Sequence, residues 1–263
     1  MPLPTIEYLC EANAPETDTR VASVYIALVS LTEVLDRHLH QIYNVDKDKS
    51  WSTANLELSL NNWVESLDGF NRRIIIRGTN LEIPGASNLR LAYLATRLLL
   101  QRIELEAYKQ TYNVHGEQMM NRYSQARRTA EEILLLVQEF SPGQLGDFWL
   151  SISAFTFPAT VNFLLRCALE TENSPSGLAQ SGSFRIARDL IEALRLHQEK
   201  YGWDLGDICL AQHAEIVDKV LAGVAPGNQT ANNVLDSHDF VMPDASIMDQ
   251  FFPSLWDPLQ NAW

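Results

Sequence analysis

Cysteine is scarce in this sequence, and the three that occur are Cys10, Cys167 and Cys209. An odd number at wide spacings fits neither a disulfide framework nor a zinc site built on Cys-x-x-Cys pairs. We therefore expect no metal in this chain and a reducing compartment. Secretion and membrane insertion are not expected, because the start has no basic and apolar leader and no apolar run reaches roughly 18 residues.

Positive charge is also in deficit, since 20 Lys and Arg face 33 Asp and Glu, for a net charge of −13. Such a chain repels phosphate backbones and anionic lipid surfaces unless basic residues gather locally. The nearest gathering is Arg72, Arg73 and Arg77, a short run typical of a solvated face. We expect no direct contact with nucleic acid and none with a membrane.

The short motifs of common enzyme families are missing as well: GxSxG, GxGxxG, HExxH and the P-loop do not occur. The stretch from Asp46 to Glu57 spaces its oxygens like a calcium loop, but Trp51 stands where such a loop needs glycine. Lys47 and Lys49 would also repel the cation. We predict a polar connection between helices here, and a protein that is not an enzyme.

Two pairs of residues with metal-binding side chains are spaced by two positions, His38 with His40 and His213 with Glu215. Side chains at this spacing point to different sides of a helix. We therefore predict that they lie at the surface or at the edge of the core, rather than around a metal.

Apolar residues that recur every three or four positions predict an all-α protein. We expect one domain of about seven helices over residues 20–227, preceded by an extension or linker at 1–19. The predicted helices cover residues 20–42, 53–67, 88–112, 115–140, 146–170, 184–201 and 204–223. The segments 68–87 and 173–183 are rich in turn residues, and Ile74 to Ile76 could form a short extended piece.

Two of these segments have special features. Residues 88–112 are apolar nearly all round, which predicts a helix enclosed by others at the centre of the bundle. Residues 146–170 are rich in aromatic side chains and contain Pro158, so we expect a kink or two shorter helices.

The aromatic segment allows two interpretations. Its rings could be ordinary core packing, or a kinked helix could open a pocket for a small apolar ligand with Arg166 as a polar anchor. The residues of that pocket would be Trp149, Phe155, Phe163 and Arg166. Both interpretations stay open at this point.

Three blocks of the sequence carry a family resemblance: GASNLRLAYLATRLLLQRIELEA (85–107), FWLSISAFTFPATVNFLLRCALET (148–171) and FRIARDLIEALRLHQEKYGWDLGDICLAQHAEIVDKVL (184–221). They resemble the fungal-specific transcription factor domain, the "middle homology" regulatory region of zinc-cluster (Zn2Cys6) transcription factors. Among these transcription factors, the sequence is most similar to those of the cutinase-activator type. The resemblance implies a non-enzymatic regulatory domain that restrains or releases activation, in some members by binding a small-molecule inducer.

The chain departs from that family at its N-terminus. Family members carry six cysteines there that hold two zinc ions and read DNA, and this chain has no such cluster. Zinc is therefore expected only in an upstream DNA-binding region. The chain would be a C-terminal piece of a larger factor or a stand-alone protein that has lost DNA binding. The resemblance implies a nuclear location, and a homodimer is left open.

The segment 228–263 contains five aspartates, neither lysine nor arginine, and many large apolar side chains. Such alternation is typical of an acidic activation segment, in which hydrated aspartates keep aromatic rings available for a partner. We expect Phe251, Phe252, Leu255 and Trp256 to bind co-activator or mediator proteins. In the alternative interpretation these rings dock on the parent domain as a clasp, and docking could itself be the switch.

The leading hypothesis is thus the regulatory and activation module of a fungal zinc-cluster transcription factor, acting through co-activators and sensing a small molecule. The alternative is a stand-alone helical small-molecule-binding protein or enzyme derived from the same scaffold.

Overall fold

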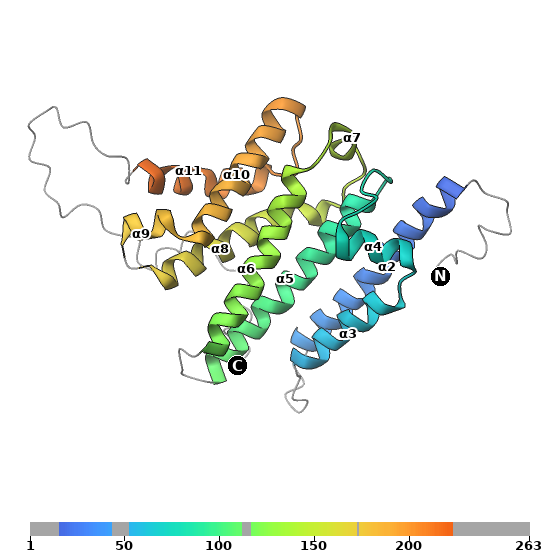
Figure 1. Cartoon of the computed structure of the whole chain (residues 1–263), viewed down its shortest axis with the longest axis horizontal. Coiled ribbons are helices and arrows are strands. Elements are labelled where there is room, and N and C mark those ends of the chain that lie inside the picture. The colour runs from blue at the N-terminus through green and yellow to red at the C-terminus, as the bar shows by residue number, and fades with distance from the viewer. Residues whose placement is uncertain (1–15, 44–52, 112–116, 173, 223–263) are drawn as a thin grey trace, which may run out of the picture.

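Helix α5 (Ala86–Thr111) lies at the centre of the molecule, and the other helices pack around it (Figure 1). The computed structural model describes residues 16–43, 53–111, 117–172 and 174–222. In these ranges the chain forms ten α-helices, one short 3-10 helix and no strand. The predicted all-α fold class is confirmed.

Besides α5, the helices have the following bounds. They are α2 (Glu16–Tyr43), α3 (Thr53–Ser66), α4 (Gly69–Arg77), α6 (Glu117–Gln138), α7 (Pro142–Leu145), η1 (Ser151–Phe155), α8 (Thr156–Thr171), α9 (Pro175–Gln180), α10 (Gly182–Tyr201) and α11 (Asp207–Ala222). The first turn of α2 falls within the range 1–19 that was expected to be an extension. The segment 228–263 lies outside the described residues.

Helix α5 contributes to two separate hydrophobic clusters, one on each side. The large core is built from α5, α6, α8, α10 and α11, and its fully buried side chains include Leu94, Ile133, Phe157, Leu164 and Leu190. The small core is built from α2, α3, α4 and α5, and includes Leu31, Leu56, Ile74, Ile75 and Leu89. A helix that is apolar nearly all round suits this position, because two of its faces are removed from water.

Arg90 of α5 joins the two sides of the molecule through polar contacts. Its guanidinium donates to the carbonyl of Ile75 near the end of α4, and it forms an ion pair with Glu132 of α6 at 3.0 Å. Glu132 also pairs with Arg97 at 3.2 Å. Burial lowers the pKa of Arg90, and the Glu132 carboxylate counteracts this effect. Each of these two charged side chains would be costly to bury alone, and the ion pair between Arg90 and Glu132 offsets that cost.

The region around Ile74 to Ile76 forms helix α4 and not the extended piece that the three β-branched residues suggested. The carboxylate of Asp68 caps the start by accepting from the backbone N–H groups of Phe70 and Asn71, both at 2.8 Å. Gly78 ends the helix with a φ of 65°, a conformation that glycine adopts without strain. Two good caps and the burial of Ile74 and Ile75 outweigh the β preference of the sequence.

The predicted loop 173–183 contains helix α9. Ser174 is its N-cap, since its hydroxyl accepts from the N–H of Gly177 at 3.1 Å, and Pro175 occupies the first helical position. Together with α4 and α7, this short helix explains why ten α-helices occur where about seven were expected. The seven predicted segments correspond to the seven longest helices.

Pro158 lies in the first turn of α8, immediately after the 3-10 helix η1. The segment 146–170 therefore divides into two shorter helices, which was one of the two outcomes expected for an internal proline. A proline in the first turn lacks an N–H group that would have no helical acceptor there. Ser151–Thr171 is long and apolar enough to cross a membrane by length and composition, but 61% of the tested window is buried inside the protein.

Two histidines that were predicted at the surface or the core edge are fully buried. His38 of α2 and His213 of α11 are each 1% exposed. Burial lowers the pKa of His213 to about 4, although the hydrogen bond to the carbonyl of Cys209 opposes the shift. Burial, and then the nearby Arg37, lower the pKa of His38. Both imidazoles are therefore neutral at neutral pH and pack as part of the core.

The Arg90 contact generates a stability prediction. Replacing Glu132→Gln removes the negative charge that faces Arg90 and Arg97, so we expect the free energy of unfolding to fall by about 2 kcal/mol. Urea unfolding measured by circular dichroism gives this value. The matched control is Glu215→Gln, which breaks the solvent-exposed pair with Lys219 and should leave the unfolding midpoint unchanged. Equal effects of the two substitutions would contradict the linking role of Arg90.

Candidate functional site

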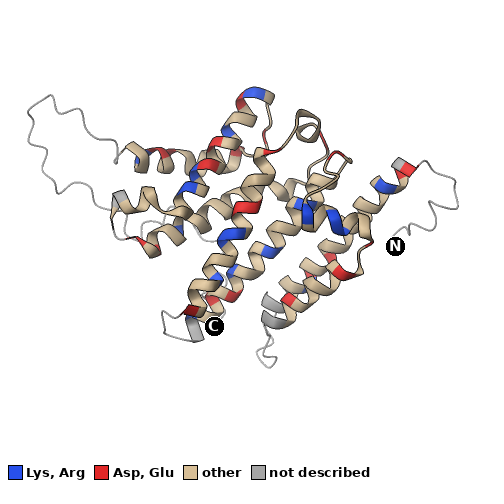
Figure 2. Cartoon of the chain, in the orientation of Figure 1, with Lys and Arg blue, Asp and Glu red and all other residues tan. Residues whose placement is uncertain are grey.

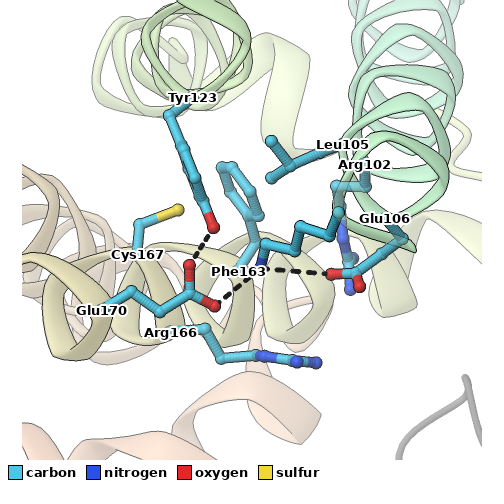
Figure 3. A pocket seen from close by; sticks show the side chains of 9 residues that line it. Arg102, Leu105, Glu106, Tyr123, Phe163, Arg166, Cys167 and Glu170 are labelled. Atoms are coloured by element: carbon cyan, nitrogen blue, oxygen red, sulfur yellow. Dashed lines mark hydrogen bonds and ion pairs between the residues drawn. The ribbon is translucent and has the colours of Figure 1, made fainter. Parts of the chain in front are cut away.

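A half-open pocket lies where α5, α6 and α8 meet (Figure 3). Its lining consists of Arg102, Leu105, Glu106 and Lys109 of α5, Tyr123 of α6, and Phe163, Arg166, Cys167 and Glu170 of α8. Its volume of about 20 Å³ gives room for roughly one water molecule. The pocket as it stands can therefore receive a small chemical group, but not a whole metabolite.

Helical spacing brings the charged side chains of this pocket together. Arg102, Glu106 and Lys109 follow one another at intervals of four and three residues, so they share one face of α5. Arg166 and Glu170 are likewise four residues apart on α8. The C-terminal halves of α5 and α8 both pack on the large core, and Lys109 of α5 meets Glu170 of α8 there.

The ammonium group of Lys109 is the centre of the polar contacts in the pocket. It lies 2.8 Å from a carboxylate oxygen of Glu170 and 3.7 Å from one of Glu106. It also lies 5.3 Å from the centre of the Tyr123 ring. The hydroxyl of Tyr123 donates to the second oxygen of Glu170. Both carboxylates of the pocket are thus already engaged by Lys109.

Arg102 is the most deeply buried cation of the pocket, with only 9% of its surface exposed. Its guanidinium donates to the carbonyl of Ala159 at 3.2 Å and lies 5.9 Å from the centre of the Phe163 ring. Burial, and then the positive charge of Arg166, lower the pKa of Arg102 to about 10. The negative charge of Glu106 acts in the opposite direction, and the guanidinium group keeps its charge at neutral pH.

The thiol of Cys167 is buried at the wall of the pocket. Burial raises its pKa to about 12, although four nearby cations act in the opposite direction. Burial also raises the pKa of Cys209 in α11. Neither thiol is ionised at neutral pH, so both act as small apolar side chains and not as nucleophiles.

The structure brings together two of the four residues that were expected to form a ligand pocket. Phe163 and Arg166 line the pocket, whereas Trp149 and Phe155 lie elsewhere. The Trp149 ring packs in the core against Phe140 and Trp203, with centroids 5.1 Å and 5.6 Å away. Phe155, at the end of η1, is 49% exposed. Trp149 precedes η1, and Phe155 ends this 3-10 helix, whose period differs from that of α8, so the three aromatic side chains do not form one stripe.

The sequence interpretation missed the residues that α5 and α6 contribute. A signal was present in the spacing of Arg102, Glu106 and Lys109, because charged residues on one face of an otherwise apolar helix are costly unless they meet partners. Tyr123 carried no such signal. Its contact with Glu170 depends on how α6 crosses α8, which spacing within one helix does not reveal.

Other sequence expectations concern parts of the chain that the structure does not describe. Phe251, Phe252, Leu255 and Trp256 lie in the segment 223–263, outside the described ranges, and so do residues 46–52 of the calcium-like stretch. In the described part of the chain, no three His, Cys, Asp or Glu side chains are grouped so that they could hold a metal ion.

Comparisons with protein-family models, with curated proteins and with solved structures found no match to this chain.

The buried thiols generate a reactivity prediction. In a Cys10→Ser variant, a thiol reagent should modify Cys167 and Cys209 slowly in the folded protein and rapidly in guanidinium. For Cys167, the raised pKa reduces the thiolate population on the order of 10³-fold relative to an ordinary thiol. Absorbance from a disulfide reagent at neutral pH measures both rates. Rapid modification of either thiol in the folded protein would contradict its burial.

Proposed function

We propose that this chain is the regulatory and activation module of a fungal zinc-cluster transcription factor. One observation carries the proposal: the three blocks that resemble the fungal-specific transcription factor domain form most of α5, α8, α10 and α11, and these helices pack around the large core. Segments that lie far apart in sequence thus belong to one folded unit, as expected if they were inherited together.

In this proposal the chain acts through proteins and not through DNA. The net charge of −13 disfavours contact with a phosphate backbone. DNA binding and its zinc ions would belong to an upstream region, and the site of action would be the nucleus. Phe251, Phe252, Leu255 and Trp256 would insert into a groove of a co-activator or mediator protein, because buried aromatic anchors supply most of the energy in such contacts.

The helical body would control that contact, and the pocket between α5 and α8 is the place where it could sense a ligand. Its lining carries three cations and two carboxylates, and its small volume restricts entry to the end of a molecule. An inducer that binds more tightly to one conformation of the body would shift the population of that conformation. Such a shift could expose or cover the acidic segment.

The second candidate is a stand-alone helical binder or enzyme on the same scaffold, and the charged pocket is the feature that favours it. A metabolite that raises the melting temperature, with no effect on transcription, would favour this candidate. A six-cysteine cluster encoded in frame upstream of Met1 would favour the first.

A reporter assay tests the proposed function. The whole chain and the segment 228–263 are each fused to an unrelated DNA-binding domain and expressed in yeast. We expect both fusions to activate the reporter. Replacing Phe251, Phe252, Leu255 and Trp256 together by alanine should lower activity about ten-fold or more, because the anchors are lost.

The matched control replaces four polar residues of the same segment by alanine, namely Ser237, Ser246, Gln250 and Asn261. This control should retain activity, and immunoblots must show equal amounts of every fusion. An inactive segment, or equal activity of the aromatic and polar variants, would overturn the activation role.

A further inference from the structure

Three large apolar side chains lie exposed within the short stretch 148–155, between α7 and α8. Ile152 is 66% exposed, Phe148 is 64% exposed and Phe155 is 49% exposed. Ile152 and Phe155 are three residues apart in the 3-10 helix η1, so they share one face of it. Single exposed apolar residues are common on protein surfaces, but a group of this size marks a place where another surface binds. We call Phe148, Ile152 and Phe155 the η1 patch.

Hydrogen bonds hold the η1 patch on the body of the protein. The side-chain amide of Asn88 in α5 donates to the carbonyl of Phe148 at 3.3 Å and accepts from the hydroxyl of Ser153 at 3.2 Å. The carboxylate of Asp147 accepts from the N–H groups of Gly85 at 2.5 Å and of Phe148 at 2.8 Å. The patch is therefore built on an anchored segment, and an occupant does not have to order this segment when it binds.

The η1 patch and the helix that follows it are uncharged over a long stretch. Residues 148–165 contain neither a basic nor an acidic side chain, whereas Figure 2 shows charged residues along α5, α6 and α10. The nearest acid along the chain is Asp147, and its carboxylate is already bound by two N–H groups. The patch therefore suits an occupant that is apolar and uncharged where the two surfaces meet.

The segment 228–263, which lies outside the described residues, contains an occupant of this chemistry. Its residues 251–256 read FFPSLW and carry no charge, with Asp249 before them and Asp257 after them. The four large apolar side chains of this stretch can pack on the η1 patch while the two aspartates keep their water. They are also the side chains proposed above to bind a co-activator, so docking and activation would compete for them.

The chain is long enough to make this contact. Phe251 follows Ala222, the last residue of α11, by 29 positions, and an extended chain of that length reaches up to about 100 Å. Helix α11 packs against η1 and is only about 24 Å long. Tethering gives the segment an effective concentration of roughly millimolar. A second copy of the protein in dilute solution is far less concentrated, so the patch takes the segment of its own chain.

We propose that Phe251, Phe252, Leu255 and Trp256, the segment anchors, dock on the η1 patch of the same chain. The inference rests on the proposed function and deepens it, because it names the surface that covers the activation segment when activation is restrained. Its test measures docking without transcription. A segment that docks but does not activate would overturn the proposed function alone, and a segment that activates without docking would overturn this inference alone.

Thiol labelling of the full chain tests the docking. Ile152→Cys, in a Cys10→Ser background, places a thiol in the η1 patch, and cysteine keeps the apolar character of the site. Cys167 and Cys209 are buried, so the fast phase of reaction with a disulfide reagent reports the new thiol. Replacing the segment anchors together by alanine should raise the labelling rate about three-fold or more, because it uncovers the patch. Phe155→Cys is a second reporter and should respond in the same way.

The matched control thiol is Met120→Cys, in the first turn of α6. Met120 is 61% exposed, and the hydrogen bond between Tyr108 and Gln118 at 3.2 Å places the start of α6 beside the end of α5. Asn88, which holds the η1 patch, lies at the opposite end of α5. The labelling rate at position 120 should therefore not respond to replacement of the segment anchors.

A second control replaces the four polar residues Ser237, Ser246, Gln250 and Asn261 by alanine, and labelling of the η1 patch should stay slow. The rate should also be the same at every protein concentration, because the contact forms within one chain. Protection that grows with concentration would identify a second copy as the occupant and would overturn the proposal. An unchanged rate after replacement of the segment anchors, or an equal effect at position 120, would overturn it as well.

Discussion

The structure depends on one constraint. Helix α5 is buried on two sides, so its side chains must pack in two hydrophobic cores at once. Such a helix has little surface left for water, and its ionisable side chains must find partners inside the protein. Arg90 does so at the junction of α4 and α6, and Arg102 does so at the seam with α8. The same requirement therefore explains both the link between the two cores and the buried position of Arg102 in the large core.

This constraint connects the fold with the proposed function. A transcriptional module that responds to a ligand needs a body that changes state as a unit and a site that is coupled to it. The pocket is formed by α5 and α8, which both belong to the large core, so a ligand there would act on the packing of the central helix. The acidic segment that follows α11 would then respond to the body, and not act alone.

Most of the fold could be predicted from the sequence, because long amphipathic helices leave a periodic pattern and a central helix leaves an apolar one. The short helices were missed for particular reasons. Three consecutive isoleucines favoured an extended segment, so the caps Asp68 and Gly78 of α4 were not recognised. The turn-forming residues around Ser174 favoured a loop, so the N-cap of α9 was not recognised either. Phe163 and Arg166, two of the four residues named for a ligand pocket, line the same pocket because they share one helix. Lys109 and Tyr123 were missed, because their contacts depend on how helices cross.

Native-state hydrogen exchange tests the central constraint most directly. If α5 couples both cores, the slowest amides of α4 and of α10 should exchange through the same opening as those of α5. Their opening free energies should agree within about 1 kcal/mol and fall in parallel with denaturant. Amides of α4 that exchange with a much smaller free energy than those of α10 would show that the small core opens independently, and would contradict this account.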